Sequence, residues 1–133
     1  MTKILGIDHV AVTAANLEET CAFYGKLFGV ETQAQYVSQG RVLVRQISIG
    51  GAVLSVHQAG NGVELVARNP TIGAADICFR WNGSIEEAIQ LLTTHDVGII
   101  EGPTPRRTAD GFASLSVFFR DLDANLTELM AAT

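Results

Sequence analysis

The chain has 133 residues, of which 47% are hydrophobic and only 17% charged, and its formal net charge is −5 at pH 7. This length suits one ordinary domain, and the acidic balance argues against nucleic acid or an anionic membrane as the main partner. So many apolar side chains in so short a chain predict that part of the apolar surface is buried in a homodimer.

The cysteine content and the N-terminus bear on where the protein works. Cys21 and Cys78 are too few for a disulfide framework, which favours a reducing compartment. Residues 1–7 lack the long apolar core of a signal peptide, and no apolar run approaches the length of a membrane span. We therefore expect a soluble, unprocessed, cytoplasmic protein.

Residues 1–58 are predicted to form a first module with the order βαβββ. Alternating apolar residues predict a strand from Gly6 to Thr13. A helix follows between Asn16, an N-cap residue, and Gly29, which suits a left-handed C-terminal position. Three further strands are predicted at residues 31–37, 41–49 and 52–58.

Residues 59–73 are rich in glycine, asparagine and proline and are predicted to be a linker. The following segment, 74–133, repeats the order of the first module. It begins with a strand at 75–81 and a helix from the N-cap Ser84 to about Thr94, stopped by Gly98. The overall prediction is an α+β fold in which helices cover one side of a curved sheet.

The rest of the second module contains a less regular part. A strand at 99–102 is predicted to be cut short by two prolines, and 106–112 to be a mobile loop near the site. Strands at 114–120 and 126–130 then flank a turn at 121–125.

The repeat places polar residues at matching points of the two modules. His9 and Asp76 open the first strands, and His57 and Glu128 lie in the last strands. If the modules pair with pseudo-twofold symmetry, these four side chains converge on one cavity. Three of them also have an ordinary structural interpretation: a partly buried histidine for His9, an exposed edge-strand residue for His57, and a solvated carboxylate for Glu128.

Several short motifs carry a family resemblance that covers nearly the whole chain. They are Asp8-His9-Val10, Phe23-Tyr24, Leu27-Phe28-Gly29, Phe119-Arg120-Asp121, and Asp123, Asn125-Leu126 and Glu128. In combination they resemble the vicinal oxygen chelate superfamily of glyoxalases, extradiol dioxygenases, fosfomycin-resistance transferases and bleomycin-binding proteins. The segments 75–79 and 101–106 are similar to a glyoxalase-domain branch often labelled dioxygenase-like or virulence-protein-like.

The resemblance implies paired βαβββ modules that form a half-open barrel around a divalent metal. Its ligand positions fall on His9, His57 and Glu128, with Glu128 also the expected catalytic residue. Asp76 stands where many members have histidine, so it would either bind the metal or only hydrogen-bond a ligand. The turn at 121–125 lacks the usual proline and glycine, which should relax the turn without removing the site.

The donor set and the strand parity indicate what the site would bind. Imidazoles with carboxylates suit Fe, Mn, Ni, Co or Zn and leave positions open for substrate oxygens. Arg80 is in phase with Asp76, and Ser116 and Phe118 share one face of their strand. These three side chains are the predicted substrate-binding residues, for an anionic or oxygen-rich small molecule. Arg80 could equally extend to solvent or pair with a glutamate.

These features predict a divalent-metal-dependent enzyme that chelates vicinal oxygens of a small-molecule substrate. The reaction would be that of a lyase or isomerase, or of a ring-cleaving oxygenase. Ring cleavage usually needs a further acid or base; His95 is predicted to lie too far away, which leaves Tyr36 as the obvious candidate. The alternative is a metal-free binding or sequestration protein of the bleomycin-resistance type.

Overall fold

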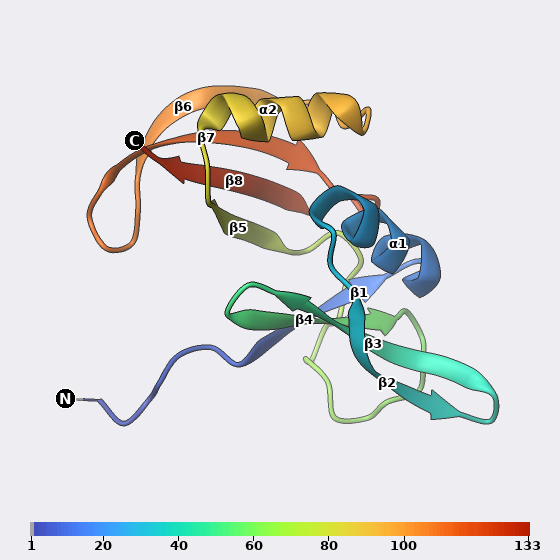
Figure 1. Ribbon diagram of the computed structural model, residues 1–133. Helices are drawn as coiled ribbons and strands as arrows, with labels where there is room; N and C mark the ends of the chain where they lie inside the picture. Colours follow the sequence, from blue (N-terminus) through green and yellow to red (C-terminus); the bar gives the residue numbers. More distant parts are fainter. Residues whose placement is uncertain (1) are drawn as a thin grey trace. The chain divides into compact units, whose positions relative to one another are not determined.

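A computed structural model describes residues 2–133 of the chain. The contacts divide it into two compact units, one ending at Ala74 and the other beginning at Ala75. Each unit contains one four-stranded mixed sheet and one helix (Figure 1). This confirms the α+β class and the tandem βαβββ modules, and neither sheet closes into a barrel by itself. Among residues 2–133 no helix is long and apolar enough to span a membrane.

The first unit has the strand order β1-β4-β3-β2, in which β1 and β4 are parallel and the other neighbours antiparallel. Its elements are β1 (His9–Ala14), α1 (Leu17–Phe28), β2 (Thr32–Ser38), β3 (Arg41–Ile49) and β4 (Ala52–Gln58). A parallel β1–β4 pair needs a long crossover connection, and α1 with the β2–β3 hairpin provides it.

Helix α1 begins and ends where its sequence predicts. The Asn16 side chain accepts a hydrogen bond from the Glu19 amide, and Gly29 takes a left-handed φ of 67° while its N–H bonds the Gly25 carbonyl. One face of the helix packs on β3 and β4. The buried apolar side chains of this layer are Leu17, Cys21, Tyr24 and Leu27 from α1, with Val12, Ile47, Leu54 and Val56 from the sheet.

The second unit repeats this arrangement with the order β5-β8-β7-β6. Its elements are β5 (Asp76–Trp81), α2 (Ile85–Thr94), β6 (Glu101–Arg107), β7 (Ala113–Arg120) and β8 (Leu126–Ala132). Helix α2 packs on β7 and β8. The core lies between them and consists of Ile85, Ala88, Leu92, Val117, Phe119, Leu129 and Ala131.

The predicted bounds of one strand in the second unit, and of the loop after it, were wrong. Strand β6 is not cut short but includes both prolines, because it is the outer strand of the sheet and an edge strand tolerates a residue without an N–H. The predicted loop at 106–112 is correspondingly reduced to residues 108–112. Helix α2 ends at Thr94 as predicted, but the residue that takes the left-handed conformation after it is Asp96, with φ of 56°, and not Gly98.

The turn between β7 and β8 is held by side chains. The Asp121 carboxylate accepts hydrogen bonds from the amides of Asp123 and Asn125, each at 2.9 Å. The Asn125 side-chain oxygen accepts from the amide of Ala75 at 2.9 Å, where the chain enters β5. Ala124 takes the positive φ, 66°, that a glycine would adopt without strain. The turn is therefore ordered although it lacks proline and glycine.

Each sheet has a helix face and an open face, the latter defined as the face opposite the unit's own helix. In β7 and β8 the odd-numbered residues Val117, Phe119 and Leu129 are buried toward α2. Because side chains alternate along a strand, the even-numbered residues lie on the open face. Among them are the predicted site residues of this unit: Asp76, Arg80, Ser116, Phe118 and Glu128.

Candidate functional site

The open face of the second unit brings together the predicted residues of β5 and β8. Asp76 is paired in register with Leu126, and Cys78 with Glu128. Asp76 and Glu128 are therefore on adjacent strands of the same face, two residues out of register. This corresponds to roughly 7 Å along the strands, which are about 4.8 Å apart. Two carboxylates and one thiol thus share a small area of the sheet.

The carboxylate of Glu128 is only partly satisfied. Its Oε2 is buried and has no hydrogen-bond partner among residues 2–133. The Cys78 thiol hydrogen-bonds the Glu128 carboxylate. Desolvation raises the pKa of Cys78 to about 11, helped by the charge and hydrogen bond of Glu128. The thiol consequently keeps its proton at neutral pH, so Cys78 is a donor to Glu128 and a poor nucleophile.

Arg80 is paired across the open face of the second unit. Its Nη1 donates to the Asp110 carboxylate at 3.1 Å, and both side chains are about half exposed. Asp110 belongs to the loop 108–112, and a hydrogen bond from Thr108 is the main cause that lowers the pKa of Asp110. Arg80 therefore pairs with an aspartate, whereas the alternatives considered from the sequence were solvent or a glutamate.

Ser116 and Phe118 lie on the open-face side of β7. The Ser116 hydroxyl is fully buried and has no hydrogen-bond partner among the described residues. The guanidinium carbon of Arg106 lies 5.4 Å from the centre of the Phe118 ring, a cation–π contact. Arg106 also pairs with Glu101 at 3.7 Å. This end of the face offers a ring and a cation.

In the first unit, His9 is held in a tautomer suited to metal binding. Its Nδ1 is 2.8 Å from the Asp8 carboxylate, and because a carboxylate can only accept, Nδ1 carries the proton. The lone pair on Nε2 is then available to a metal. A carboxylate that orients an imidazole in this way is the usual support of a metal-bound histidine. The side chain is 53% exposed.

His57 lies elsewhere on the same face. In register His9 pairs with Val53, whereas His57 pairs with Thr13, four residues further along β1. At about 3.3 Å per residue the two histidines are roughly 13 Å apart along the strands. The residue of β4 that corresponds in register to Glu128 of β8 is Ser55. The module symmetry thus relates Glu128 to Ser55, which differs from the pairing with His57 expected from the sequence.

The tautomer of His57 also differs from that of His9. The Asn61 amide is oriented by two bonds, since its oxygen accepts from the Val63 amide at 2.9 Å and its nitrogen donates to the Leu43 carbonyl at 3.0 Å. The same nitrogen is 3.5 Å from Nδ1 of His57, which must accept, so the proton is on Nε2. Burial lowers the pKa of His57, which also favours the neutral ring.

The fit of a metal can be tested on these donors. Among residues 2–133 no group of three or more His, Cys, Asp and Glu side chains is arranged to hold an ion. The unpartnered oxygen of Glu128, the neighbouring Asp76 and the free Nε2 of His9 are individually suited to a divalent metal. For His57, which contacts Asn61 through Nδ1, the ligand role expected from the sequence stays a prediction.

Three relevant residues were missed by sequence reasoning. Cys78 lies between Asp76 and Arg80 in the alternation of β5, but was considered only for disulfides and compartment. Asp110 and Asn61 fall in segments interpreted as a mobile loop and a linker. The parity of β5 was a usable signal for Cys78, whereas no sequence pattern indicated the partners of the two loop residues.

Two βαβββ units in tandem, each with polar side chains on its open sheet face, place the chain among the proteins built from repeated βαβββ modules. A profile of the Glyoxalase/Bleomycin resistance protein/Dioxygenase superfamily matches residues 6–129. The chain belongs to this superfamily, as the motifs of its sequence predict.

Similar proteins support the same assignment. The chain is 33% identical over 127 residues to the glyoxalase domain-containing protein RDO1 of Mycosarcoma maydis, covering 96% of this chain and 68% of that protein. It is 31% identical over 123 residues to the virulence protein STM3117 of Salmonella typhimurium, covering 92% and 81%. A solved integron cassette protein from the mobile metagenome of V. cholerae superposes with a TM-score of 0.87 at 32% identity, covering 100% and 99%.

Proposed function

We propose that this protein is a divalent-metal-dependent enzyme for an oxygen-rich small molecule, with Glu128 at the centre of its site. The observation that carries the proposal is the buried Oε2 of Glu128, which has no partner among the described residues. A buried carboxylate oxygen without a partner is costly, and a cation is a natural partner for it. The superfamily commonly binds divalent metals.

The proposed ligands are Glu128 and Asp76, which share one face of the second unit. His9 is proposed separately, as a donor within the first unit. Asp76 is supported by its position on the same face as Glu128, and His9 by its hydrogen bond to Asp8. His57 is not assigned to this pair, because its Nδ1 lies 3.5 Å from the Asn61 amide nitrogen; its role as a ligand stays a prediction from the sequence. The mixed nitrogen and oxygen donors suit Fe, Mn, Ni, Co or Zn, which would polarise two adjacent substrate oxygens.

The remaining residues of the second open face would bind substrate. Arg80 and the buried Ser116 hydroxyl supply a cation and a hydrogen-bonding group, and Phe118 with Arg106 supplies a ring and a second cation. The face contains protonated sulfur and carboxylates but neither histidine nor tyrosine. Such a set favours proton transfer, as in a lyase or isomerase, over ring cleavage.

The experiment that tests this proposal is titration of each of the five metals into chelator-stripped protein. We expect about one ion per chain, and at least tenfold weaker binding in Glu128→Gln and Asp76→Asn. Ser55→Ala is the matched control, because Ser55 holds the register position of Glu128 in the other unit. Equal binding by all variants would exclude these ligands.

The second candidate is a metal-free binding protein for an anionic, ring-containing molecule. The stacking of Arg106 on Phe118 favours it, because a cation above a ring suits such a ligand without any metal. Wild-type protein that takes up none of the five metals would decide for this candidate.

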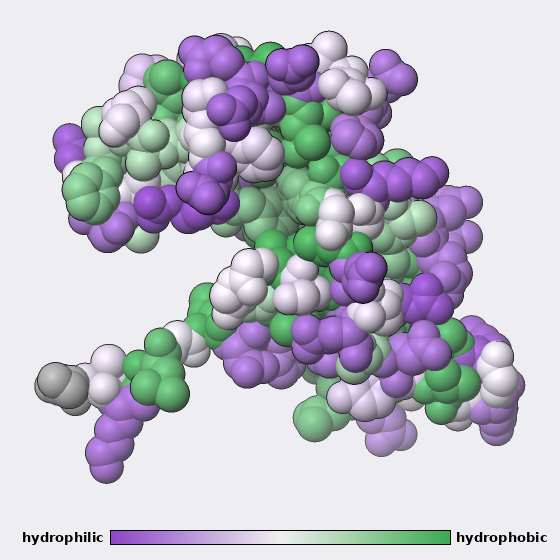
Figure 2. All heavy atoms as spheres, viewed as in Figure 1, coloured by the Kyte–Doolittle hydropathy of each residue, from purple (hydrophilic) through white to green (hydrophobic). Residues whose placement is uncertain are grey.

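The expected homodimer remains a prediction. Large apolar side chains are exposed before β1, where Ile4, Leu5 and Ile7 are each at least 71% accessible, and on β2 at Tyr36 and Val37. Figure 2 shows the hydrophobic side chains of the segment that precedes β1. A second copy would remove such surface from water. A sedimentation mass equal to one chain would contradict this expectation.

A further inference from the structure

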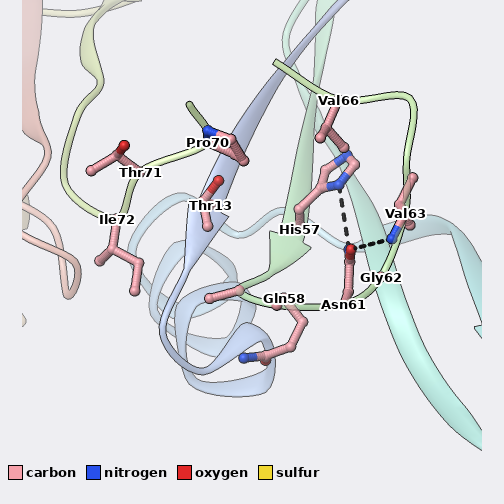
Figure 3. Close-up of a pocket in the computed structure, with 12 residues that line it drawn as sticks. Thr13, His57, Gln58, Asn61, Gly62, Val63, Val66, Pro70, Thr71 and Ile72 are labelled. Carbon is pink, nitrogen blue, oxygen red and sulfur yellow. Dashed lines mark hydrogen bonds between the residues drawn. The ribbon is translucent and has the colours of Figure 1, made fainter. Parts of the chain in front are cut away.

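The first unit contains a cavity that the proposed metal site does not use. It has a volume of about 420 Å³ and lies where the loop 59–72 approaches the ends of β1 and β4 (Figure 3). Thr13 and His57 form its wall on the sheet, and Val63, Val66 and Ile72 contribute apolar side chains from the loop. This volume is within the range of about 300–1,000 Å³ that is typical of small-molecule pockets.

The lining limits the charge of a ligand. All twelve lining residues are uncharged at neutral pH, given that His57 is neutral there. An ion placed among them would lose hydration and gain no opposite charge. The lining therefore selects a neutral molecule. Because two valines, an isoleucine, a proline, an alanine and two glycines form seven of the twelve lining positions, the body of that molecule must be largely apolar.

One directed polar group points to the functional group of the ligand. His57 accepts from Asn61 at Nδ1, so its Nε2–H is a hydrogen-bond donor. In Figure 3 the ring lies between Asn61 and Val66. A donor within an apolar pocket favours a ligand that carries an acceptor oxygen, such as a carbonyl.

The walls of the cavity are held in place without a ligand. Gln58 accepts from the Leu17 amide at 2.9 Å and donates to the Ala15 carbonyl at 2.8 Å, which fixes the end of β4. Asn61 anchors the loop to the carbonyl of Leu43 on β3. These bonds hold the loop against the sheet, so binding costs little ordering of the protein.

We infer that this cavity binds a neutral, mainly apolar small molecule whose carbonyl-type oxygen accepts a hydrogen bond from Nε2 of His57. The inference is independent of the proposed metal site of the second unit, whose residues are Glu128 and Asp76. The cavity would give the protein a second ligand class, distinct from the anionic or oxygen-rich molecule proposed for the second unit.

The test is a titration of the full chain, followed by amide NMR shifts, with two rigid probes. Camphor is an apolar ketone, and 2-methylenebornane has a methylene group in place of its carbonyl oxygen. We expect camphor to shift the amides of residues 57–72 and to bind about 5-fold more tightly than 2-methylenebornane, as one net hydrogen bond allows.

Two variants separate the hydrogen bond from the cavity. His57→Leu replaces the ring with an apolar side chain of similar size that cannot donate a hydrogen bond. Camphor should therefore bind this variant about 5-fold more weakly, while 2-methylenebornane binds unchanged. Thr71→Trp, at the exposed rim, should fill the space and abolish binding of both probes. His95→Leu is the control, because His95 caps α2 in the second unit and should leave both affinities unchanged.

Three results would overturn the inference. They are the absence of shifts at saturating camphor, shifts confined to residues of the second unit, and equal camphor affinity in His57→Leu and the wild type. Dispersed amide spectra of the free variants would show that each is folded. Failure here would leave the metal titration of Glu128→Gln unaffected, so the two proposals can fail separately.

Discussion

The open faces of the two units have the same backbone register and different chemistry. At one equivalent pair of positions, the first unit has Ser55, which accepts a hydrogen bond from Gln46 at 2.9 Å, and the second has Glu128 with a free oxygen. The first face ends in an uncharged cavity, whereas Arg80 and Asp110 form an ion pair on the second.

Two units with the same backbone fold can therefore carry different functional side chains at equivalent positions. Strand β1 pairs with β4 in the same way as β5 pairs with β8. Equivalent side chains therefore point to the same face in both units, because their direction depends on the backbone alone. Which groups occupy those positions can differ freely between the units. Charged side chains are concentrated on the open face of the second unit, so we expect the reaction to take place there. The uncharged cavity of the first unit suits a neutral ligand.

The largest expected effect comes from breaking the close packing of β6 on the second sheet. A Cβ on Gly102 would lie 2.3 Å from the Ser116 carbonyl oxygen, and φ at Gly102 is +107°. No glycine described in the first unit has so close a neighbour. Gly102→Ala should therefore lower the free energy of unfolding by about 2–4 kcal/mol, measured by urea denaturation.

Gly98→Ala is the matched control for this substitution. Gly98 is in the same unit, has no positive φ, and no atom lies within 4 Å of the added Cβ. Its unfolding free energy should change by less than about 0.5 kcal/mol. A similar loss of stability in both variants would mean that β6 does not pack closely at Gly102.

A smaller effect should follow from releasing Arg80 on the second face. In Asp110→Asn the guanidinium of Arg80 loses its negative partner and becomes available to an anion. Affinity for benzoate, measured by calorimetry on chelator-treated protein, should rise about 2- to 5-fold, as for an exposed ion pair.

The control for Asp110→Asn removes the same charge from the other side of the sheet. Glu86→Gln lies in the first turn of α2, which packs on the helix face. Its benzoate affinity should match that of the wild type. If both variants gained equally, the cause would be net charge and not the Arg80–Asp110 pair.

The smallest expected effect is a pH dependence from His57 in the first unit. Burial lowers the pKa of His57 below its ordinary value of 6.5, so the unfolded chain takes up a proton more readily than the folded one. The part of the unfolding free energy that depends on His57 being neutral is fully present above pH 6.5. It is lost as the pH falls toward the lower pKa of His57 in the folded chain.

His57→Leu removes this titration. The loss of unfolding free energy between about pH 7.5 and pH 5.5, measured by urea denaturation, should be smaller in the variant than in the wild type. Parallel stability curves would show that His57 titrates equally in the folded and unfolded chains.

Much of the fold could be predicted because it depends on local signals. Asn16, Gly29 and Ser84 are at the predicted helix ends, since caps satisfy backbone groups within a few residues. The extent of β6 was not predictable, because whether a strand tolerates Pro103 depends on its place at the sheet edge, which local sequence does not contain.

For the candidate site, the sequence could predict which face of a strand a side chain occupies, but not how the strands are aligned with one another. Alternation correctly placed Asp76 and Arg80 on one face of β5. It could not show that His57 lies four register positions from the partner of His9, because register depends on pairing between distant strands. It also could not show that Asn61 fixes the tautomer of His57, since that contact depends on how a loop folds back.

The hydrogen bonds of Asn125 restrict how the length of this chain can vary before Glu128. Asn125 is tied to both Asp121 and Ala75, so it sets the point from which β8 is counted. Alternation has a period of two, and one residue inserted between Asn125 and Glu128 would turn the carboxylate into the apolar layer beneath α2. An insertion of two residues would preserve its direction. Insertions between Asn125 and Glu128 are therefore restricted to even numbers of residues.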